Sequence, residues 1–242
     1  MADLALSNSL IDEYVKYRLN NNYDQSIIRK LFKYIQPFSI KSDNICMSDP
    51  SMPALLENDP LIEIIEPCSD EELVQNTILK FMITDNDSPE SYKILYLDSP
   101  TEKLKPKYGA TYINKFGKDK AQEHIKFLLS DASYINITDA YIATTRNWSD
   151  NKALIASIVP NINIILTIIG ADKGNESVIS ESKIDELKSL LPSLSEVRAN
   201  RLASNVHDRY IKTDKIKILM SSGLDNLLLS SETDFTYIIE IL

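Results

Sequence analysis

Apolar residues recur at helical spacing near the start of the chain, in two stripes separated by a polar, asparagine-rich turn. The stripe residues are Leu10, Tyr14, Val15, Tyr17, Ile27, Ile28, Leu31 and Phe32. Spacings of three and four residues are typical of amphipathic helices, so we predict a helical hairpin within residues 9–35. A helix-turn-helix DNA reader fits the same pattern, but this part of the chain is acidic and we favour a packing unit. Further along, we predict a helix over 71–83 and a strand over 92–98.

From residue 107 onward, helical and extended patterns alternate, and extended patterns gather toward the C-terminus. The predicted helices cover 119–132, 149–159 and 182–191, with Ser149 as an N-cap and Pro192 as a stop. The predicted strands cover 134–139, 163–169, 196–202, 207–212, 215–221 and 235–242. Helices between strands, followed by a run of strands, indicate an α/β sandwich built on a mixed sheet.

Proline positions divide the chain in two. Eight of the ten prolines lie before residue 107, and each removes a backbone donor and restricts the residue before it. We therefore predict a smaller, mixed α+β module over 1–106 and a larger α/β domain over 107–242. A chain of 242 residues is long enough for both.

Charge is distributed unevenly along the chain. The net charge is −9, and residues 1–106 account for most of it, with 10 Lys and Arg against 18 Asp and Glu, a net of −8. Residues 198–217 instead hold six basic residues against Asp208 and Asp214, a local net of +4. Overall acidity argues against a general nucleic-acid binder, because affinity for phosphate backbones depends on clustered Lys and Arg. The basic segment nevertheless predicts an anionic ligand near 198–217.

Several further features favour an intracellular protein. Cys46 and Cys68 have no His cluster near them, which predicts reduced thiols rather than a zinc site or a disulfide. No apolar run reaches the roughly 18 residues that a membrane span needs, and the N-terminus lacks the pattern of a secretory signal. Gly170 and Gly174 are followed by no Lys-Ser/Thr pair, so the phosphate loop of an NTPase is not expected. We expect a cytoplasmic protein without a cofactor.

The candidate chemistry lies in and after the basic segment. The chain has two histidines, and one of them, His207, is followed by Arg209, Asp214, Ser222 and Asn226. Alternate residues of a strand share a face, so His207 and Arg209 are predicted to project together. A glycine turn can bring Ser222 and Asn226 back beside them. An imidazole, a guanidinium, a hydroxyl and an amide on one face suit a phosphate group.

This arrangement resembles the motif of the phospholipase D superfamily. His207, Arg209 and Asp214 form His-x-Arg-x-x-x-x-Asp, one residue type away from the His-x-Lys-x-x-x-x-Asp of that superfamily. Ser222 and Asn226 resemble the Gly-Ser-x-Asn element that follows it. The arginine form is similar to the phospholipase D-like domain at the C-terminus of some MIT-domain proteins, and to related bacterial domains. The resemblance covers 107–242, and residues 1–106 resemble no family.

The resemblance implies cleavage of phosphodiesters without a metal. His207 would attack phosphorus to form a phosphohistidine, a second histidine would protonate the leaving group, and water would hydrolyse the intermediate. Arg209 and Asn226 would hold the non-bridging oxygens. Asp234 would orient the imidazole, and Asp214 would fix the turn. Because the chain has one motif, two histidines imply a homodimer in which His207 of each copy meets one phosphate.

Three functions stay open at this point. The first is a homodimeric nuclease acting on DNA or RNA, with the acidic module as a regulatory or partner-docking unit and bacterial antiviral defence as one setting. The second is a catalytically silent phospholipase D-like domain that binds a protein or an anionic headgroup, because Arg is not a conservative replacement for Lys at a tight site. The third is transcriptional regulation through the helices of 1–106.

Four other residues have a structural and a functional interpretation. We interpret His124 as a partly exposed helix residue, and Tyr141 and Trp148 as core residues rather than platforms for stacking a base. Asp139, at the end of a predicted central strand, either shapes the site or caps the segment after it.

Overall fold

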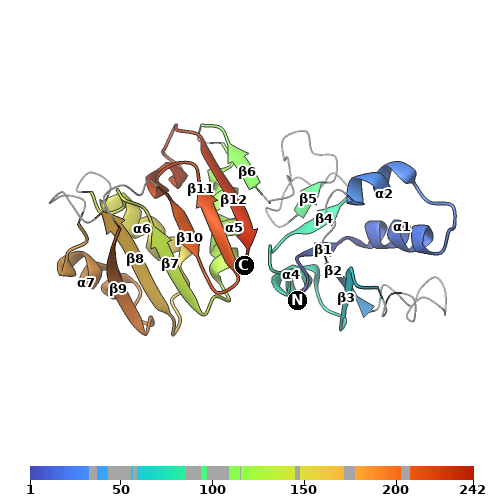
Figure 1. Cartoon of the computed structure of the whole chain (residues 1–242), viewed down its shortest axis with the longest axis horizontal. Coiled ribbons are helices and arrows are strands. Elements are labelled where there is room, and N and C mark those ends of the chain that lie inside the picture. Colours follow the sequence, from blue (N-terminus) through green and yellow to red (C-terminus); the bar gives the residue numbers. More distant parts are fainter. Residues whose placement is uncertain are drawn as a thin grey trace. The chain divides into compact units, whose positions relative to one another are not determined.

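The computed structural model describes residues 1–32, 37–42, 56, 59–85, 94–96, 109–114, 116–144, 148–171, 178–202 and 208–242. His207 and Cys46 lie outside these residues. The chain divides into two compact units, Met1–Pro106 and Lys107–Leu242, which Figure 1 shows with their elements labelled. The division falls where the prolines become sparse.

The first unit is built on a parallel sheet. Its strands are β1 (Leu4–Leu6), β2 (Phe38–Lys41), β3 (Ile62–Ile65), β4 (Met82–Thr84) and β5 (Ile94–Tyr96), and its helices include α1 (Asn8–Arg18), α2 (Gln25–Leu31) and α4 (Asp70–Gln75). The strand order is β3-β2-β1-β4-β5, and every recorded pairing is parallel. Parallel neighbours define an α/β arrangement, whereas the sequence predicted a mixed α+β module.

Local signals explain where the helices of the first unit begin. The Asp24 side chain accepts hydrogen bonds from the backbone of Ser26 and Ile27 at the start of α2. Ser69 and Glu72 form a capping box at the start of α4. The predicted hairpin of α1 and α2 is confirmed, whereas the helix predicted over 71–83 ends at Gln75 and its last residues form β4.

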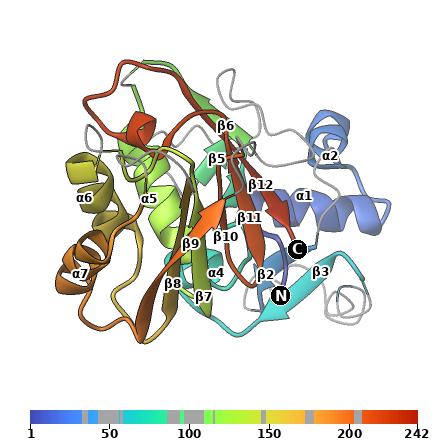
Figure 2. The same ribbon diagram turned by 60° about the vertical axis from the view of Figure 1, so that its left-hand side comes forward.

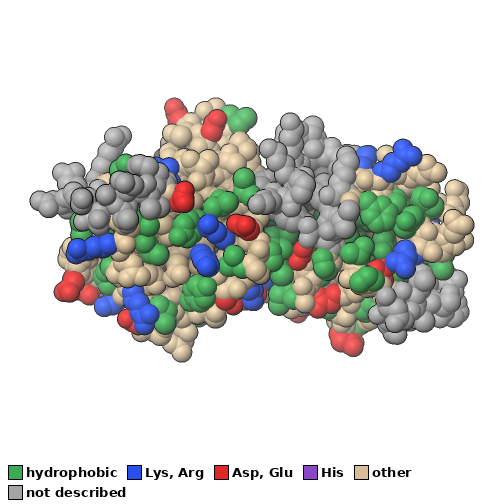
Figure 3. Space-filling view, in the orientation of Figure 1, with side chains coloured by type: hydrophobic (Ala, Val, Ile, Leu, Met, Phe, Trp, Pro, Cys, Tyr) green, Lys and Arg blue, Asp and Glu red, His purple; other side chains and the backbone are tan. Residues whose placement is uncertain are grey.

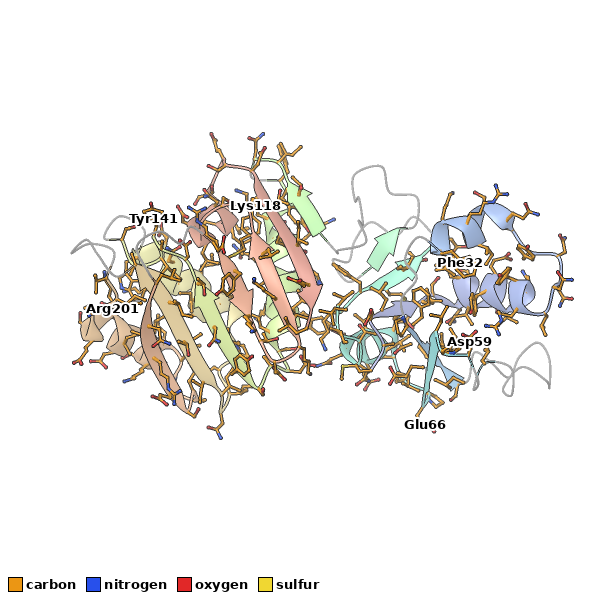
Figure 4. All side chains as sticks on the ribbon, viewed as in Figure 1. Phe32, Asp59, Glu66, Lys118, Tyr141 and Arg201 are labelled. Carbon is orange, nitrogen blue, oxygen red and sulfur yellow. The ribbon has the colours of Figure 1, made fainter. Side chains whose placement is uncertain are left out.

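A buried polar network ties α1 to the segment before β3. The Tyr14 hydroxyl donates to Asp59 Oδ2 at 2.7 Å, and Arg18 Nη1 contacts the same carboxylate and lies 3.2 Å from the Tyr14 hydroxyl. Figure 4 labels Asp59 beside α1. Tyr14 and Asp59 are buried, and burial, together with the bond to Asp59, raises the pKa of Tyr14 to about 12.

We expect Tyr14→Phe to remove a pH-dependent part of the stability. Because the pKa of Tyr14 is above its ordinary value of 10.0 in the folded chain, its contribution is complete below pH 10 and is lost as the pH rises through 12. Between pH 8 and pH 11 the unfolding free energy of the unmodified protein should fall by about 1.4 kcal/mol more than that of the variant. Urea unfolding at both pH values measures this difference, and equal losses would contradict it.

The second unit is built on a mixed sheet of seven strands. They are β6 (Gly109–Tyr112), β7 (Tyr134–Thr138), β8 (Ile165–Ala171), β9 (Glu196–Leu202), β10 (Tyr210–Lys212), β11 (Ile216–Met220) and β12 (Phe235–Ile241), in the order β6-β12-β11-β10-β7-β8-β9. β7, β8 and β9 are parallel, and the other pairs are antiparallel. The α/β fold with a mixed sheet, predicted from the sequence, is therefore confirmed.

Three helices cover one face of this sheet. They are α5 (Lys118–Leu129), α6 (Trp148–Ile158) and α7 (Glu181–Leu190), and Figures 1 and 2 agree in placing them together on that face. A row of cross-strand partners, Ile137, Ile211, Ile218 and Ile239, lies in the core. The alternation of buried and half-buried residues along β11 follows from the two-residue period of a strand.

A buried lysine fastens the loop before β12 to α5. Lys118 is fully buried, and its Nζ donates to the carbonyl oxygens of Ser231 at 2.6 Å and Thr233 at 2.7 Å. Burial lowers the pKa of Lys118, and the nearby Asp234 carboxylate opposes this change. Figure 4 labels Lys118 on α5. The loop that follows the 3-10 helix η3 (Leu224–Leu227) is therefore held at a defined place on the unit.

Candidate functional site

The candidate site lies at one end of the central strands of the second unit. β10 is antiparallel to β7 and to β11, and Tyr210 is opposite both Thr138 and Leu219. The residue before β10 therefore meets the residues that follow β7 and β11. These residues are Asp139, Tyr141, Arg209, Ser222 and Gly223, which together we call the Arg209 site.

Arg209 is the basic group of this site. Its carbonyl accepts a hydrogen bond from Met220 N at 2.9 Å, which holds its backbone against the end of β11. Its side chain is 26% exposed, yet Nε is buried without a hydrogen-bond partner among the described residues. Nε lies 3.6 Å from Asp139 Oδ1, an ion pair that is too long for a hydrogen bond. The exposed area of the side chain therefore belongs to atoms other than Nε.

Tyr141 forms one side of the Arg209 site. The guanidinium carbon of Arg209 lies 5.8 Å from the centre of the Tyr141 ring, within the range of a cation–π contact. The ring is 48% exposed, so the expectation that Tyr141 is a core residue was wrong. Figure 4 labels it at the end of the unit where β7 finishes. Trp148 is buried, as expected, and donates from Nε1 to Glu186 at 3.0 Å.

The turn after β11 brings a second unsatisfied group to the site. Ser222 Oγ is buried and has no hydrogen-bond partner in the described part of the chain. Gly223 follows it, and a Cβ there would lie 2.3 Å from Asp225 Oδ1 and 3.4 Å from Asp139 Oδ2. A side chain at 223 would displace the Asp225 carboxylate. Thr138 Oγ1 is also buried without a partner, but strand alternation puts Thr138 on the other face of the sheet.

The structure brings together part of the predicted constellation. His207 lies outside the described residues, so its place beside Arg209 stays a prediction. Asn226 lies in η3, where its Oδ1 accepts from Ser231 Oγ at 3.2 Å. The side chain of Asn226 therefore has a partner five residues further along the chain, in the loop fastened by Lys118.

Asp214 and Asp234 lie away from Arg209. Asp214 is in the turn between β10 and β11, where Oδ1 accepts from Ser133 N at 3.0 Å. That turn is at the opposite end of β10, about 15 Å from Arg209 at the rise of an extended strand. A ligand held by Arg209 cannot touch Asp214, which leaves the turn-fixing role.

Asp234 is exposed and accepts from Asn114 N at 2.9 Å. It precedes β12, which is separated from β10 by β11. Two strand spacings amount to about 10 Å. Whether its carboxylate reaches the imidazole of His207 stays a prediction.

The second histidine is more buried than its sequence suggests. His124 is 1% exposed on α5, and its Nδ1 lies 2.6 Å from the hydroxyl of Tyr237 on β12. The expectation of a partly exposed residue was wrong, because α5 turns this side chain toward the sheet. His124 is part of the core, where it contacts Tyr237 of β12.

The basic segment 198–217 does not form one cluster. Arg198 lies on β9 and pairs with Glu196 at 2.5 Å, and Lys215 pairs with Asp131 at 3.0 Å. β9 and β10 are separated by β7 and β8, which puts roughly 14 Å between them. Figure 3 shows Lys and Arg side chains dispersed among acidic and apolar ones on the viewed face of the second unit. Neighbours in sequence are distributed over the sheet, and within the described part of the chain Arg209 is the basic residue that contacts Asp139 and Tyr141.

The fold defines the second unit as an α/β domain with a mixed sheet, and the comparisons with known proteins go little further. No family model and no curated protein matches the sequence. Among the described residues, none of the helices has the length and apolar character required to cross a bilayer.

Solved structures give low-scoring overlaps. Phosphatidylserine synthase from Haemophilus influenzae Rd KW20 overlaps at 13% identity and TM-score 0.32, over 55% of this chain and 34% of that chain. TrmBL2, an archaeal chromatin protein, overlaps at 13% identity and TM-score 0.27, over 58% of this chain and 47% of that chain. Polyphosphate kinase from Porphyromonas gingivalis overlaps at 12% identity and TM-score 0.31, over 81% of this chain and 29% of that chain.

This chain covers half or less of the length of each of these proteins. At such scores the overlaps carry no argument about function, which must come from the Arg209 site itself.

Proposed function

We propose that residues 107–242 form one half of a phospholipase D-like phosphodiesterase that acts on nucleic acid as a homodimer. One observation carries the proposal: the partly exposed side chain of Arg209 and a buried, unpartnered hydroxyl, Ser222 Oγ, lie at the same end of the central strands. Buried polar groups without partners cost stability, and a bound ligand is one way in which they are satisfied. A phosphate monoanion supplies both the charge and the acceptors that these groups lack.

In the proposed reaction, an imidazole nitrogen of His207 attacks phosphorus and the bond to the leaving oxygen breaks. The imidazolium of His207 in the second copy gives its proton to that oxygen. Water then attacks the phosphohistidine, its proton passes to the second imidazole, and the N–P bond breaks to restore both groups. Arg209 stabilises the charge on the non-bridging oxygens. Asp214 fixes the turn after β10 and takes no part in the chemistry.

The nuclease assay that tests this proposal compares Arg209→Ala with the unmodified protein in the presence of EDTA. Single- and double-stranded DNA and RNA serve as substrates. We expect kcat/KM to fall about 100-fold, because a preorganised donor to a charged transition state is lost. Arg198→Ala is the matched control, since Arg198 is exposed and paired with Glu196, and it should leave the rate unchanged. Full activity in Arg209→Ala, or a monomer mass at assay concentration, would contradict the proposal.

A binding module without catalysis is the second candidate. Two observations favour it: the Asn226 amide already has a partner in Ser231, and the basic segment is dispersed. Arg209→Lys in the same assay separates the two candidates. Turnover should rise if the site is a weakened enzyme that prefers lysine, and no cleavage by either form would favour the binding module. Cytoplasmic location, antiviral defence and a partner for residues 1–106 stay predictions.

A further inference from the structure

Asp139 is a buried acid at the centre of the second unit. It directly follows β7, and its backbone N–H donates to Ile169 O at 3.1 Å, so that it continues the pairing with β8. Its residue is 1% exposed. Asp139 is two residues after Ile137, and Arg209 is two residues before Ile211, the partner of Ile137. Alternate residues of a strand share a face, so Asp139 and Arg209 lie on the same face of the sheet as these core isoleucines.

The carboxylate of Asp139 joins three separate segments. Oδ1 accepts from Tyr141 N at 2.9 Å, in the loop after β7. Oδ2 accepts from Leu224 N at 3.1 Å, at the start of η3. Oδ1 also faces Nε of Arg209 at 3.6 Å, just before β10. One side chain therefore fixes the relative positions of Tyr141, the Gly223 turn and the guanidinium.

This carboxylate is kept in place at a cost in stability. Burial raises the pKa of Asp139, and the hydrogen bonds from Tyr141 N and Leu224 N and the charge of Arg209 only partly oppose that rise. The pKa of Asp139 in the folded chain is above its ordinary value of 3.8. The contribution of the protonated acid to the unfolding free energy is therefore complete below pH 3.8, and it is lost as the pH rises through the pKa of the folded chain. At neutral pH, the ionised group therefore stabilises the fold less than a neutral one in its place would. The two backbone bonds and the proximity of Arg209 are the interactions that hold the acid at this position.

We propose that Asp139 is the positioning residue of the Arg209 site: it faces the Nε edge of the guanidinium, so that the two terminal nitrogens of Arg209 receive an anion of phosphate size. The inference rests on the proposed function, because it names the group that prepares Arg209 for the ligand. Arg209 has five N–H donors in a rigid fork. With the Nε edge facing a buried carboxylate, the outer donors are left for the ligand beside the Tyr141 ring and Ser222.

The experiment measures the binding of inorganic phosphate to the full chain by titration calorimetry, and the hydrolysis of bis(4-nitrophenyl) phosphate. Asp139→Asn is expected to weaken phosphate binding about 10-fold, since a neutral amide cannot form an ion pair with the guanidinium of Arg209. In the double variant with Arg209→Ala, the Asn substitution should add no further loss, because Asp139 acts through Arg209. Asp59→Asn is the matched control: it also neutralises a buried aspartate, in the first unit, and should leave phosphate binding unchanged.

Each outcome decides one point. Unchanged binding in Asp139→Asn, when Arg209→Ala abolishes binding, overturns the inference and leaves the proposed function standing. Unchanged binding in Arg209→Ala overturns the proposed function itself. Additive losses in the double variant show that Asp139 does not act through Arg209. If Asp139→Asn does not fold, Asp139→Glu keeps the charge and shifts the carboxylate, and wild-type binding by that variant overturns the inference.

Discussion

His207→Ala is expected to lower phosphodiester cleavage at least about 10⁴-fold, to below detection, because removal of a nucleophile leaves only ground-state binding and charge stabilisation. Phosphate binding should persist within a few-fold, since Arg209 is still present. The unmodified protein, quenched during turnover, should carry an acid-labile phosphate on His207 that mass spectrometry detects and that the variant lacks.

The chain supplies its own control for this experiment. His124 is the other histidine, buried against Tyr237. His124→Gln should lower the unfolding midpoint but leave the cleavage rate per folded molecule unchanged. Cleavage that survives in His207→Ala would refute the covalent mechanism, whatever happens in the control.

Lys118→Met is expected to destabilise the second unit by about 3 kcal/mol. The substitution preserves much of the apolar stem but leaves the carbonyl groups of Ser231 and Thr233 without their donor, and hydrogen bonds to a charged group contribute about 1.5–3 kcal/mol each. The measurement is urea unfolding followed by circular dichroism. Because Ser231 also binds Asn226, we expect faster hydrogen exchange over 226–234 in the variant.

Lys126→Met provides the comparison on the same helix. Lys126 is exposed in the last turn of α5, so its replacement should change the unfolding free energy by no more than about 0.5 kcal/mol. If both substitutions changed the unfolding free energy equally, the hydrogen bonds from Lys118 would contribute no more to stability than an exposed lysine does.

The elements predicted best are those whose periodicity is long and undisturbed. β9 has the expected bounds, and α7, β8, β11 and β12 lie within one or two residues of them at both ends. A long repeating pattern of apolar and polar residues is what local reasoning can detect. α6 begins at Trp148, one residue before the expected N-cap Ser149. The strand predicted over 207–212 begins at Tyr210, although the Arg209 carbonyl still pairs with β11.

The short strands of the first unit could not be predicted in the same way. β1 and β4 have three residues each, all of them buried, so they show no alternation. Near the end of α4, the chain turns at Lys80 with a φ of 58°, a conformation that lysine rarely adopts and that no sequence pattern signals. The apolar residues of β4 happen to continue the helical spacing of α4, which is why the sequence predicted one helix over 71–83.

The site was predicted in its residue types better than in its geometry. Arg209 and Ser222 were expected together and both lie at the end of the central strands, but Asp214 is at the far end of β10. A spacing in sequence does not tell which side of a turn a residue occupies. The Asp139–Arg209 pair depends on β7 and β10 becoming neighbours, and only an acid directly after an apolar strand hinted at it.

The order of strands in the first unit has a consequence for biosynthesis. The middle strand, β1, is made first, yet one of its partners lies 77 residues later, as the pairing of Leu6 with Ile83 shows. During translation β1 must wait with an unpaired edge, which invites association with other nascent chains or capture by a chaperone. Deletion of residues 1–6 would remove β1, which lies between β2 and β4, and would leave the pairs β3-β2 and β4-β5 without a strand to join them.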